Sequence, residues 1–198
     1  MSSKRFLDVT ASLAGLMVLW PLLAVVALAI RLESPGRAFF LQERVGRYGR
    51  RFQIVKLRTM RAAGPGGTRQ ITVGADARIT TLGHFLRKTK LDELPQLVNV
   101  LKGEMSLVGP RPEVPAYIDR YTPEQRAIIL SVRPGITDFA AIEFSDEAEI
   151  LARAQDPEAA YIEQVMPMKF KLYERYVREQ SLRLDLKLIL LTLIKITK

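Results

Sequence analysis

The sequence predicts an α+β fold that is mostly helical, with a small β-hairpin and one long apolar helix near the N-terminus. Three observations support this prediction. Residues 9–30 carry no charge, and two short apolar runs with glycines between them follow in 39–55. Most of the remaining chain places apolar residues at helical spacing. We expect two parts, a membrane-embedded helix in residues 1–34 and a domain at the membrane surface in residues 35–198.

Composition narrows the chemistry that is open to the chain. It has 198 residues, 48% of them hydrophobic, which is enough for one domain with a core. Because 30 Lys and Arg face 21 Asp and Glu, the net charge of +9 indicates an anionic partner, such as nucleic acid, lipid headgroups or a phosphorylated substrate. There is no cysteine and His84 is the one histidine, which excludes thiolate catalysis, Cys-based zinc sites and multi-histidine metal sites.

The uncharged segment Val9–Ile30 is long enough to cross a bilayer, which needs roughly 20 apolar residues. Pro21, which follows Trp20, lies near its middle and predicts a kink, because proline removes a helical hydrogen bond and clashes with the preceding turn. Such a helix either spans the bilayer or re-enters the same face. Basic residues flank both ends, which favours the re-entrant form, since cytoplasmic flanks carry the Lys/Arg excess. A buried helix of a soluble protein is the alternative.

Two strands are expected next. Phe39–Leu41 and Phe52–Val55 are short apolar runs, and the glycines between them are typical of a hairpin. The stretch 60–76 is rich in glycine and predicts a long loop, which is either a lid over a substrate or a plain surface loop.

Helices account for most of the remainder. Helical spacing predicts a helix over Thr80–Arg87 and another that starts near Asp92, with Pro95 in its first turn and Gly103 as its C-terminal cap. The segment 133–135 predicts a turn. Further helices are expected over 123–130, 147–155, 157–166 and 169–198. The last part, Leu182–Ile196, is strongly apolar with basic residues on one side, so it suits either the membrane surface or a packing role.

Asp92 and Glu93 are the main candidates for chemistry. At the start of a helix the backbone can turn both carboxylates toward one site, where the helix dipole and nearby basic residues would keep them ionised. An ionised aspartate can attack phosphorus and form an aspartyl-phosphate intermediate. Its neighbour can bind Mg²⁺, which takes one or two carboxylates plus substrate phosphates. Alternatively, Asp92 caps the helix and Glu93 is an anion of its first turn.

Basic side chains with restricted backbones complete a candidate phosphate site. Arg111 lies between two prolines, which limit its conformations, and arginine makes paired hydrogen bonds to phosphate. Lys56 and Arg58 follow the apolar run of the second strand and are therefore candidates for phosphate contacts at its end. Arg111 as a solvated residue of a structural turn is the alternative. His84 has no assigned role.

Together these segments resemble the monotopic phosphoglycosyl transferases, a family of bacterial sugar transferases. The likeness covers nearly the whole chain in order. It rests on Lys4–Asp8, on the apolar stretch with its central Pro21, and on segments 42–46, 52–60, 91–97, 99–106, 108–112, 132–137 and 184–187.

The resemblance implies a membrane enzyme on the cytoplasmic face of a bacterial inner membrane. It would transfer a sugar phosphate from a UDP-sugar to polyprenol (undecaprenyl) phosphate, giving polyprenol diphosphosugar and UMP, as the first membrane step of polysaccharide or glycoconjugate synthesis. The resemblance implies a two-step reaction with Asp92 as nucleophile and Mg²⁺ as cofactor on Glu93. Arg87 and Arg111 would hold phosphates, and Lys56 would be a further site residue.

The chain departs from the family pattern in three places. Trp20 replaces the usual serine before the proline. Residues 138–145 differ from the usual Gly-Trp-Ala-Gln-Val-Asn-Gly-Arg and lack its arginine, and Tyr173 stands where many members have aspartate. The last two departures concern donor recognition. Because Asp92 and Glu93 are present, we expect an active enzyme of a variant subgroup, in the minimal catalytic form.

Other functions remain open at this point. Asp92 could act as a base in a one-step transfer between the same substrates, or the protein could be a non-catalytic membrane scaffold. Nucleic acid is not an expected partner, because aromatics interleaved with Lys and Arg are missing. Membrane lipids are expected partners, and both a monomer and a homodimer are compatible with the sequence.

Overall fold

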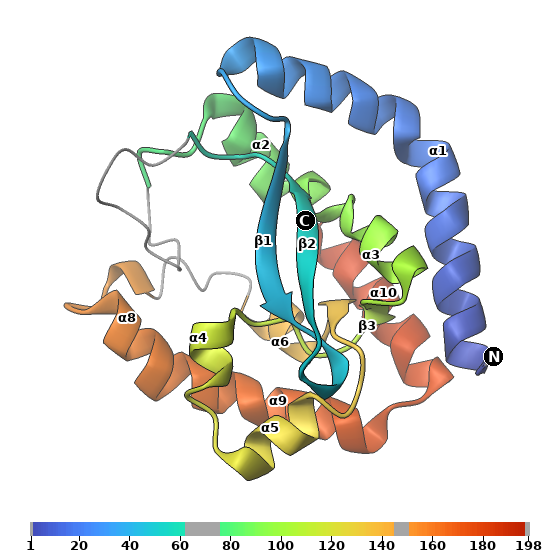
Figure 1. Ribbon diagram of the computed structural model, residues 1–198, viewed down its shortest axis with the longest axis vertical. Coiled ribbons are helices and arrows are strands. Elements are labelled where there is room, and N and C mark those ends of the chain that lie inside the picture. The colour runs from blue at the N-terminus through green and yellow to red at the C-terminus, as the bar shows by residue number, and fades with distance from the viewer. Residues whose placement is uncertain (1, 62–75, 145–150, 197–198) are drawn as a thin grey trace.

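The computed structural model describes residues 2–61, 76–144 and 151–196. Its fold confirms the expected class, since helices dominate and the strands are few and short. Figure 1 shows the long helix α1 (Ser3–Glu33) running along one side of the molecule and bending over the end where the hairpin starts. Pro21 lies inside α1, where its ring removes the hydrogen bond to the Met17 carbonyl, the usual physical source of such bends.

The expected hairpin is present and longer than predicted. Strands β1 (Phe39–Val45) and β2 (Arg51–Leu57) pair in antiparallel register, with Phe40 opposite Lys56. A 3₁₀ turn, η1 (Arg47–Gly49), joins them. Polar residues within the strands hid their length, because only one face of the hairpin is buried.

The chain after the hairpin confirms one predicted helix and corrects another. Helix α2 (Thr81–Lys88) begins at the Thr80 cap, close to where it was expected. The next helix, α3 (Gln96–Lys102), does not start near Asp92 as predicted. Instead, Lys90 adopts a left-handed conformation with φ of 56° and a separate 3₁₀ turn, η2 (Leu91–Glu93), precedes α3. Gly103 ends α3 with φ of 83°, as predicted.

A parallel pair of short strands was not predicted. β3 (Ser106–Val108) pairs with β4 (Gly135–Thr137), so the expected turn at 133–135 runs into a strand. The two backbones approach closely here, because a Cβ on Gly135 would lie 2.1 Å from the Gly109 nitrogen. Three-residue strands carry too little pattern to be found by alternation.

The C-terminal half is helical and packs beneath the hairpin. Its elements are α4 (Pro115–Ile118), α5 (Pro123–Ile129), α6 (Phe139–Glu143), α8 (Pro157–Ala160), the π-helical turn η3 (Tyr161–Val165), α9 (Met166–Glu179) and α10 (Leu182–Ile196). The helix predicted over 157–166 thus continues through a π turn into α9. Pro167 explains this turn, since it has no N–H to donate. The loop 60–76 falls largely outside the described residues. The predicted helix 147–155 lies outside them up to residue 150, and of its described part, 151–155, only residues 151–152 are helical.

Four buried clusters hold the described parts together, and two of them flank the candidate site. The larger one packs α4, α5 and α9 around aromatic side chains that include Tyr117, Tyr161 and Tyr173. The second packs the end of α1 against β2 and α2 through Ile30, Leu57, Leu86 and their neighbours. Most of the residues predicted to do chemistry lie on β2, on η2 and on the loop after β3.

Candidate active site

Three of the predicted site residues meet in one ion-pair cluster. Glu93, on η2, accepts hydrogen bonds at its Oε1 atom from Lys56 Nζ at 2.7 Å and from Arg111 Nη2 at 2.6 Å. Arg111 Nη1 lies 3.4 Å from the second oxygen, Oε2. The cluster therefore joins β2, η2 and the loop after β3, three elements that are far apart in the sequence.

The side chain of Asn99 explains why η2 lies beside β2. It is fully buried on α3, donates to the Gln53 carbonyl at 2.7 Å and accepts from the Val55 N–H at 3.0 Å. These two bonds fix α3 to the edge of β2. Because η2 directly precedes α3, they also set the distance between Lys56 and Glu93.

Asp92 lies next to this cluster with an unsatisfied oxygen. Its residue is 7% exposed, and its Oδ1 atom is buried without a hydrogen-bond partner. Burial, and next the charge of Glu93, raises the pKa of Asp92, while Lys56, Lys90 and Arg87 oppose the shift. A buried polar atom without a hydrogen-bond partner costs free energy of folding. The Oδ1 atom of Asp92 is therefore a candidate to contact a substrate.

The two carboxylates respond differently to their neighbouring cations. The Arg111 and Lys56 charges overcome the effect of burial and hold the pKa of Glu93 well below its usual range. Burial lowers the pKa of Lys56 to about 8, although Glu93 opposes the shift. At Asp92 desolvation outweighs the neighbouring cations, so the pKa of Asp92 is raised from its usual value.

Arg87 lies on the Asp92 side of the site, whereas Arg58 contacts the C-terminal end of α1. Arg87 lies in the last turn of α2, and its charge lowers the pKa of Asp92, which puts it on the Asp92 side of the site. Arg58 was predicted to bind phosphate, but its guanidinium donates to the Ser34 carbonyl at 2.7 Å and to the Ile30 carbonyl at 3.2 Å. It therefore ties the end of α1 to β2, and the structure gives no support for its assignment to the phosphate site.

The loop that carries Arg111 is held on both sides. The Pro110 carbonyl accepts from the Gly135 N–H at 2.9 Å, and the Pro112 carbonyl accepts from Arg44 Nη1 at 3.0 Å. The N–H of Arg111 itself donates to Asp138 Oδ2 at 2.9 Å. These hydrogen bonds fix the backbone of Arg111 and of both neighbouring prolines. They argue against the alternative that Arg111 is a solvated residue of a structural turn.

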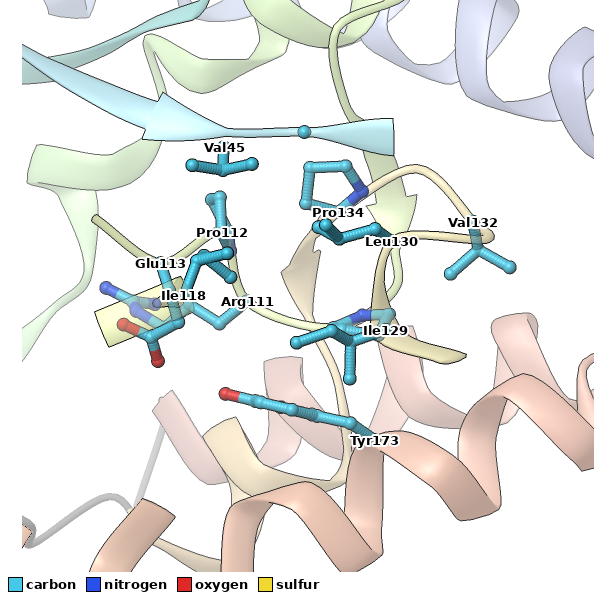
Figure 2. A pocket seen from close by; sticks show the side chains of 12 residues that line it. Val45, Arg111, Pro112, Glu113, Ile118, Ile129, Leu130, Val132, Pro134 and Tyr173 are labelled. Atoms are coloured by element: carbon cyan, nitrogen blue, oxygen red, sulfur yellow. The ribbon is translucent and has the colours of Figure 1, made fainter. Parts of the chain in front are cut away.

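A small pocket lies behind this loop. Figure 2 shows Tyr173, from α9, beneath the segment that carries Arg111 and Glu113. The Tyr173 hydroxyl is buried and makes no hydrogen bond, and burial together with the charges of Asp138 and Glu113 raises the pKa of Tyr173 well above its usual range. Two of the departures from the family pattern, at Asp138 and Tyr173, therefore lie on the same side of Arg111.

Comparison of the sequence with known proteins shows the family of the chain. The sequence model of one family, described as bacterial sugar transferase, matches residues 1–198. The chain belongs to the bacterial sugar transferase family.

Several relatives of this sugar transferase carry names that state a reaction. A UDP-glucose:undecaprenyl-phosphate glucose-1-phosphate transferase of Caulobacter vibrioides is 47% identical over 70% of the chain and 53% of its own length. The Escherichia coli protein of the same name is 35% identical over 97% of the chain and 39% of its own length. A putative undecaprenyl-phosphate N-acetylgalactosaminyl 1-phosphate transferase of Bacillus subtilis is 44% identical over 61% of the chain and 68% of its own length. The chain thus spans about half of the first of these relatives and less of the second.

The donor atoms of this sugar transferase fit a magnesium ion that shares substrate oxygens. Among the residues that the structure describes, no group of three His, Asp or Glu side chains could hold a metal by itself. A carboxylate offers about four acceptor positions, and Oε2 of Glu93 has one long contact. One carboxylate with substrate phosphates is an ordinary magnesium environment.

Sequence reasoning missed the residues that support the site of this sugar transferase. Asn99, Arg44 and Asp138 touch the backbone of site elements, and none of them was a candidate for chemistry. Asn99 and Arg44 stand in segments that carried the resemblance, but their role depends on partners more than 40 residues away.

Proposed function

We propose that this sugar transferase moves a sugar phosphate from a UDP-sugar to undecaprenyl phosphate through a covalent intermediate on Asp92. The observation that supports this proposal is the buried Oδ1 of Asp92, which lacks a partner beside a cluster of cationic side chains. The named relatives use UDP-sugar donors and an undecaprenyl phosphate acceptor.

In the first step, an oxygen of Asp92 attacks the phosphorus that carries the sugar. The new Asp92 O–P bond forms while the bond from that phosphorus to the bridging oxygen breaks, and the bridging oxygen leaves with UMP. Burial raises the pKa of Asp92 and makes it a more basic nucleophile than an exposed aspartate. Lys56, Arg87 and Arg111 offer positive charge to the transferring phosphates.

In the second step, an oxygen of undecaprenyl phosphate attacks the same phosphorus. The Asp92 O–P bond breaks, which restores the carboxylate and releases undecaprenyl diphosphosugar. The acceptor oxygen is already anionic at neutral pH, so this step needs no general base. A magnesium ion on Glu93 would supply further positive charge to the phosphates.

Mass spectrometry of the purified protein in nanodiscs tests this proposal directly. The protein is incubated with Mg²⁺ and either UDP-glucose or UDP-N-acetylgalactosamine, without acceptor. We expect an adduct of one phosphosugar on the peptide that contains Asp92, together with release of UMP. Turnover with acceptor present but no adduct in its absence would contradict the covalent step.

The pH dependence of donor use is expected to be bell-shaped. The acid limb of kcat/KM reports the raised pKa of Asp92 and so lies above the usual value of 3.8. The basic limb lies near pH 8, because Lys56 loses its charge as the pH rises through its lowered pKa of about 8. Initial rates between about pH 3 and 10 measure both limbs. Lys56→Arg should move the basic limb upward, since arginine keeps its charge, and an unmoved limb would exclude Lys56 as its source.

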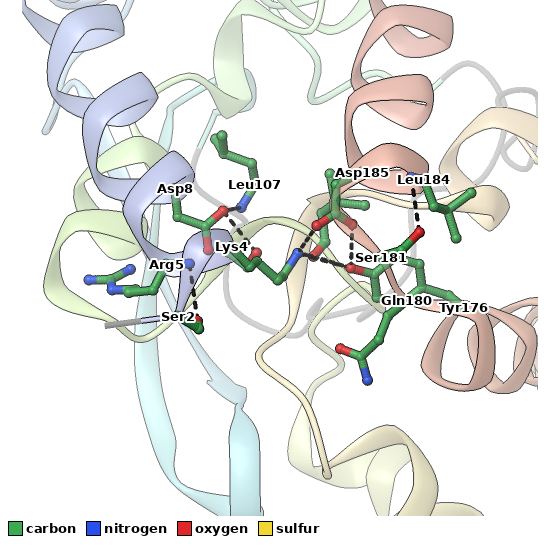
Figure 3. A network of polar contacts seen from close by, with 12 residues as sticks. Ser2, Lys4, Arg5, Asp8, Leu107, Tyr176, Gln180, Ser181, Leu184 and Asp185 are labelled. Atoms are coloured by element: carbon green, nitrogen blue, oxygen red, sulfur yellow. Dashed lines mark hydrogen bonds and ion pairs between the residues drawn. The ribbon is translucent and has the colours of Figure 1, made fainter.

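The membrane arrangement follows from how both ends of α1 are attached. Among the described residues, α1 is the helix long and apolar enough to cross a bilayer. Figure 3 shows its first turns bound to the domain, where Lys4 Nζ contacts Asp185 Oδ2 at 2.6 Å and Asp8 accepts from the Leu107 N–H at 3.0 Å. At the other end, Arg58 holds the last carbonyls of α1.

We infer from these contacts that α1 is re-entrant. The charged groups at both ends belong to one polar domain, and that domain cannot lie in the hydrocarbon core. Both ends of α1 are therefore at the same membrane face, which the basic flanks assign to the cytoplasm. The side chain of Trp20 is 63% exposed at the middle of α1 and is available to contact lipid.

Cysteine labelling tests the re-entrant arrangement without a background signal, because the chain has no cysteine. Ser3→Cys and Arg37→Cys lie at the two ends of α1, and Glu124→Cys on α5 marks the domain. In membrane vesicles, all three are expected to react with an impermeant maleimide from the same side. Opposite sidedness of Ser3→Cys and Arg37→Cys would establish a spanning helix.

A further inference from the structure

Asp138 is a fully buried carboxylate with two backbone partners. It is 1% exposed and lies at the start of α6, directly after β4. Its Oδ1 atom accepts from the Ala141 N–H at 2.6 Å, which caps α6, and its Oδ2 atom accepts from the Arg111 N–H at 2.9 Å. One side chain therefore bridges a helix start and the loop that carries Arg111.

Capping α6 does not account for this arrangement. Asp156 caps α8 with the same kind of contact, to the N–H groups of Glu158 and Ala159 at 3.0 and 3.1 Å, and its bonds are exposed. Asp138 is buried instead, and burial raises its pKa to about 6 although the backbone N–H of Ala141 and Arg111 favour the charged form. A serine or asparagine would cap α6 without a buried charge.

The position of Asp138 couples it to the chemistry through Arg111. The Arg111 backbone is restricted by a proline on each side and by the Asp138 bond, while its guanidinium holds Glu93. The groups that face Asp138 from other elements include Arg111 and Lys169, whose charges lower its pKa, and Tyr173 and Tyr176 on α9. Arg111 is the member of this set that donates a hydrogen bond to Glu93.

We propose that Asp138 is a positioning residue for the transfer reaction, and that it aims Arg111 at Glu93 and the substrate phosphates by holding the Arg111 N–H. This inference rests on the proposed function. It assigns a role to a residue that stands where the chain departs from the usual family pattern, so this subgroup would orient its phosphate-binding arginine through a buried carboxylate.

Two substitutions separate positioning from capping. Asp138→Ser keeps a helix cap but is too short to reach Arg111, and Asp138→Asn keeps the shape but has one acceptor oxygen for two N–H groups. The matched control is Asp156→Ser, which changes a cap of the same kind on α8. Initial rates with UDP-glucose and UDP-N-acetylgalactosamine are measured for each protein in nanodiscs, beside the thermal unfolding temperature.

We expect Asp138→Ser and Asp138→Asn to lower kcat/KM by about ten- to a hundredfold, the range for a misplaced catalytic group, while Asp156→Ser keeps wild-type rates. In an Arg111→Lys background the same Asp138 changes should lower kcat/KM by less than about threefold, because the arginine that Asp138 orients is already absent. Wild-type rates in both Asp138 variants, or an equal loss in both backgrounds, would overturn the positioning role. Absence of wild-type turnover with every donor would overturn the proposed function itself, and the role with it.

Discussion

The Asp92→Asn variant is expected to lose transfer activity by on the order of 10⁴-fold, as nucleophile variants of other enzymes do. The amide keeps the shape of the carboxylate but cannot form the acyl phosphate. The fold should survive, because Asp92 Oδ1 accepts no hydrogen bond that the amide would break. Removal of a buried charge whose pKa is raised also relieves strain, so the unfolding temperature should stay the same or rise slightly.

Three measurements together show which step of the reaction the Asp92→Asn variant affects. Release of UMP with undecaprenyl phosphate present gives turnover, the phosphosugar adduct gives covalent chemistry, and exchange of labelled UMP into the UDP-sugar without acceptor reports a reversible first step. Asp119→Asn, a change at an exposed carboxylate, is the control and should keep full activity. Loss of turnover in Asp92→Asn, in a protein whose wild type shows neither adduct nor exchange, would favour a one-step transfer with Asp92 as base. Unchanged function in Asp92→Asn would indicate a scaffold.

Glu93→Gln is expected to destabilise the protein by about 3–5 kcal/mol, the usual cost of removing one member of a buried ion pair. Lys56 and Arg111 would then face each other as like charges without the carboxylate that now binds both. For a chain of this size the loss corresponds to about 10 °C in unfolding temperature. Activity should also fall by about a hundredfold or more, because the two cations proposed to bind phosphate lose their orientation.

Thermal unfolding in nanodiscs and donor turnover measure this variant. The matched control is Glu43→Gln, which removes the exposed pair with Arg51 and should shift the unfolding temperature very little. A second variant, Glu93→Gln with Lys56→Met, removes one of the stranded charges and should recover part of the stability but none of the activity. Equal unfolding temperatures for Glu93→Gln and Glu43→Gln would show that the ion-pair cluster does not form in solution.

Local sequence signals predicted elements whose pattern is complete within a few residues. The apolar length of α1, the glycine that ends α3 and the threonine cap of α2 are such signals. The β3–β4 pair could not be predicted from local sequence, since it depends on a close approach between Gly109 and Gly135, which are 26 residues apart. The start of α3 was misplaced because the left-handed turn at Lys90 has no distinctive residue type.

The candidate site likewise contains residues whose role the sequence predicted and residues whose role it did not. Asp92, Glu93 and Arg111 could be predicted, because adjacent carboxylates and an arginine between prolines are visible in the sequence, and Lys56 joins them in the structure. Arg58 looked equivalent to Lys56, two residues away and just past the end of β2, but its partners are carbonyls at the C-terminal end of α1. The opposite pKa shifts of Asp92 and Glu93 could not be predicted from the sequence, because they depend on burial and on which carboxylate the cations reach.

The contact between Lys4 and Asp185 has a consequence for how the protein is made. The two residues are 181 positions apart, and at about 5–20 residues per second a ribosome needs roughly 10–40 s to pass from one to the other. Until Asp185 is made, Lys4 lacks the carboxylate that binds it in the finished fold, whereas Asp8 can already accept from the Leu107 N–H. The N-terminal end of α1 is therefore attached in stages, first to the segment around β3 and later to α10.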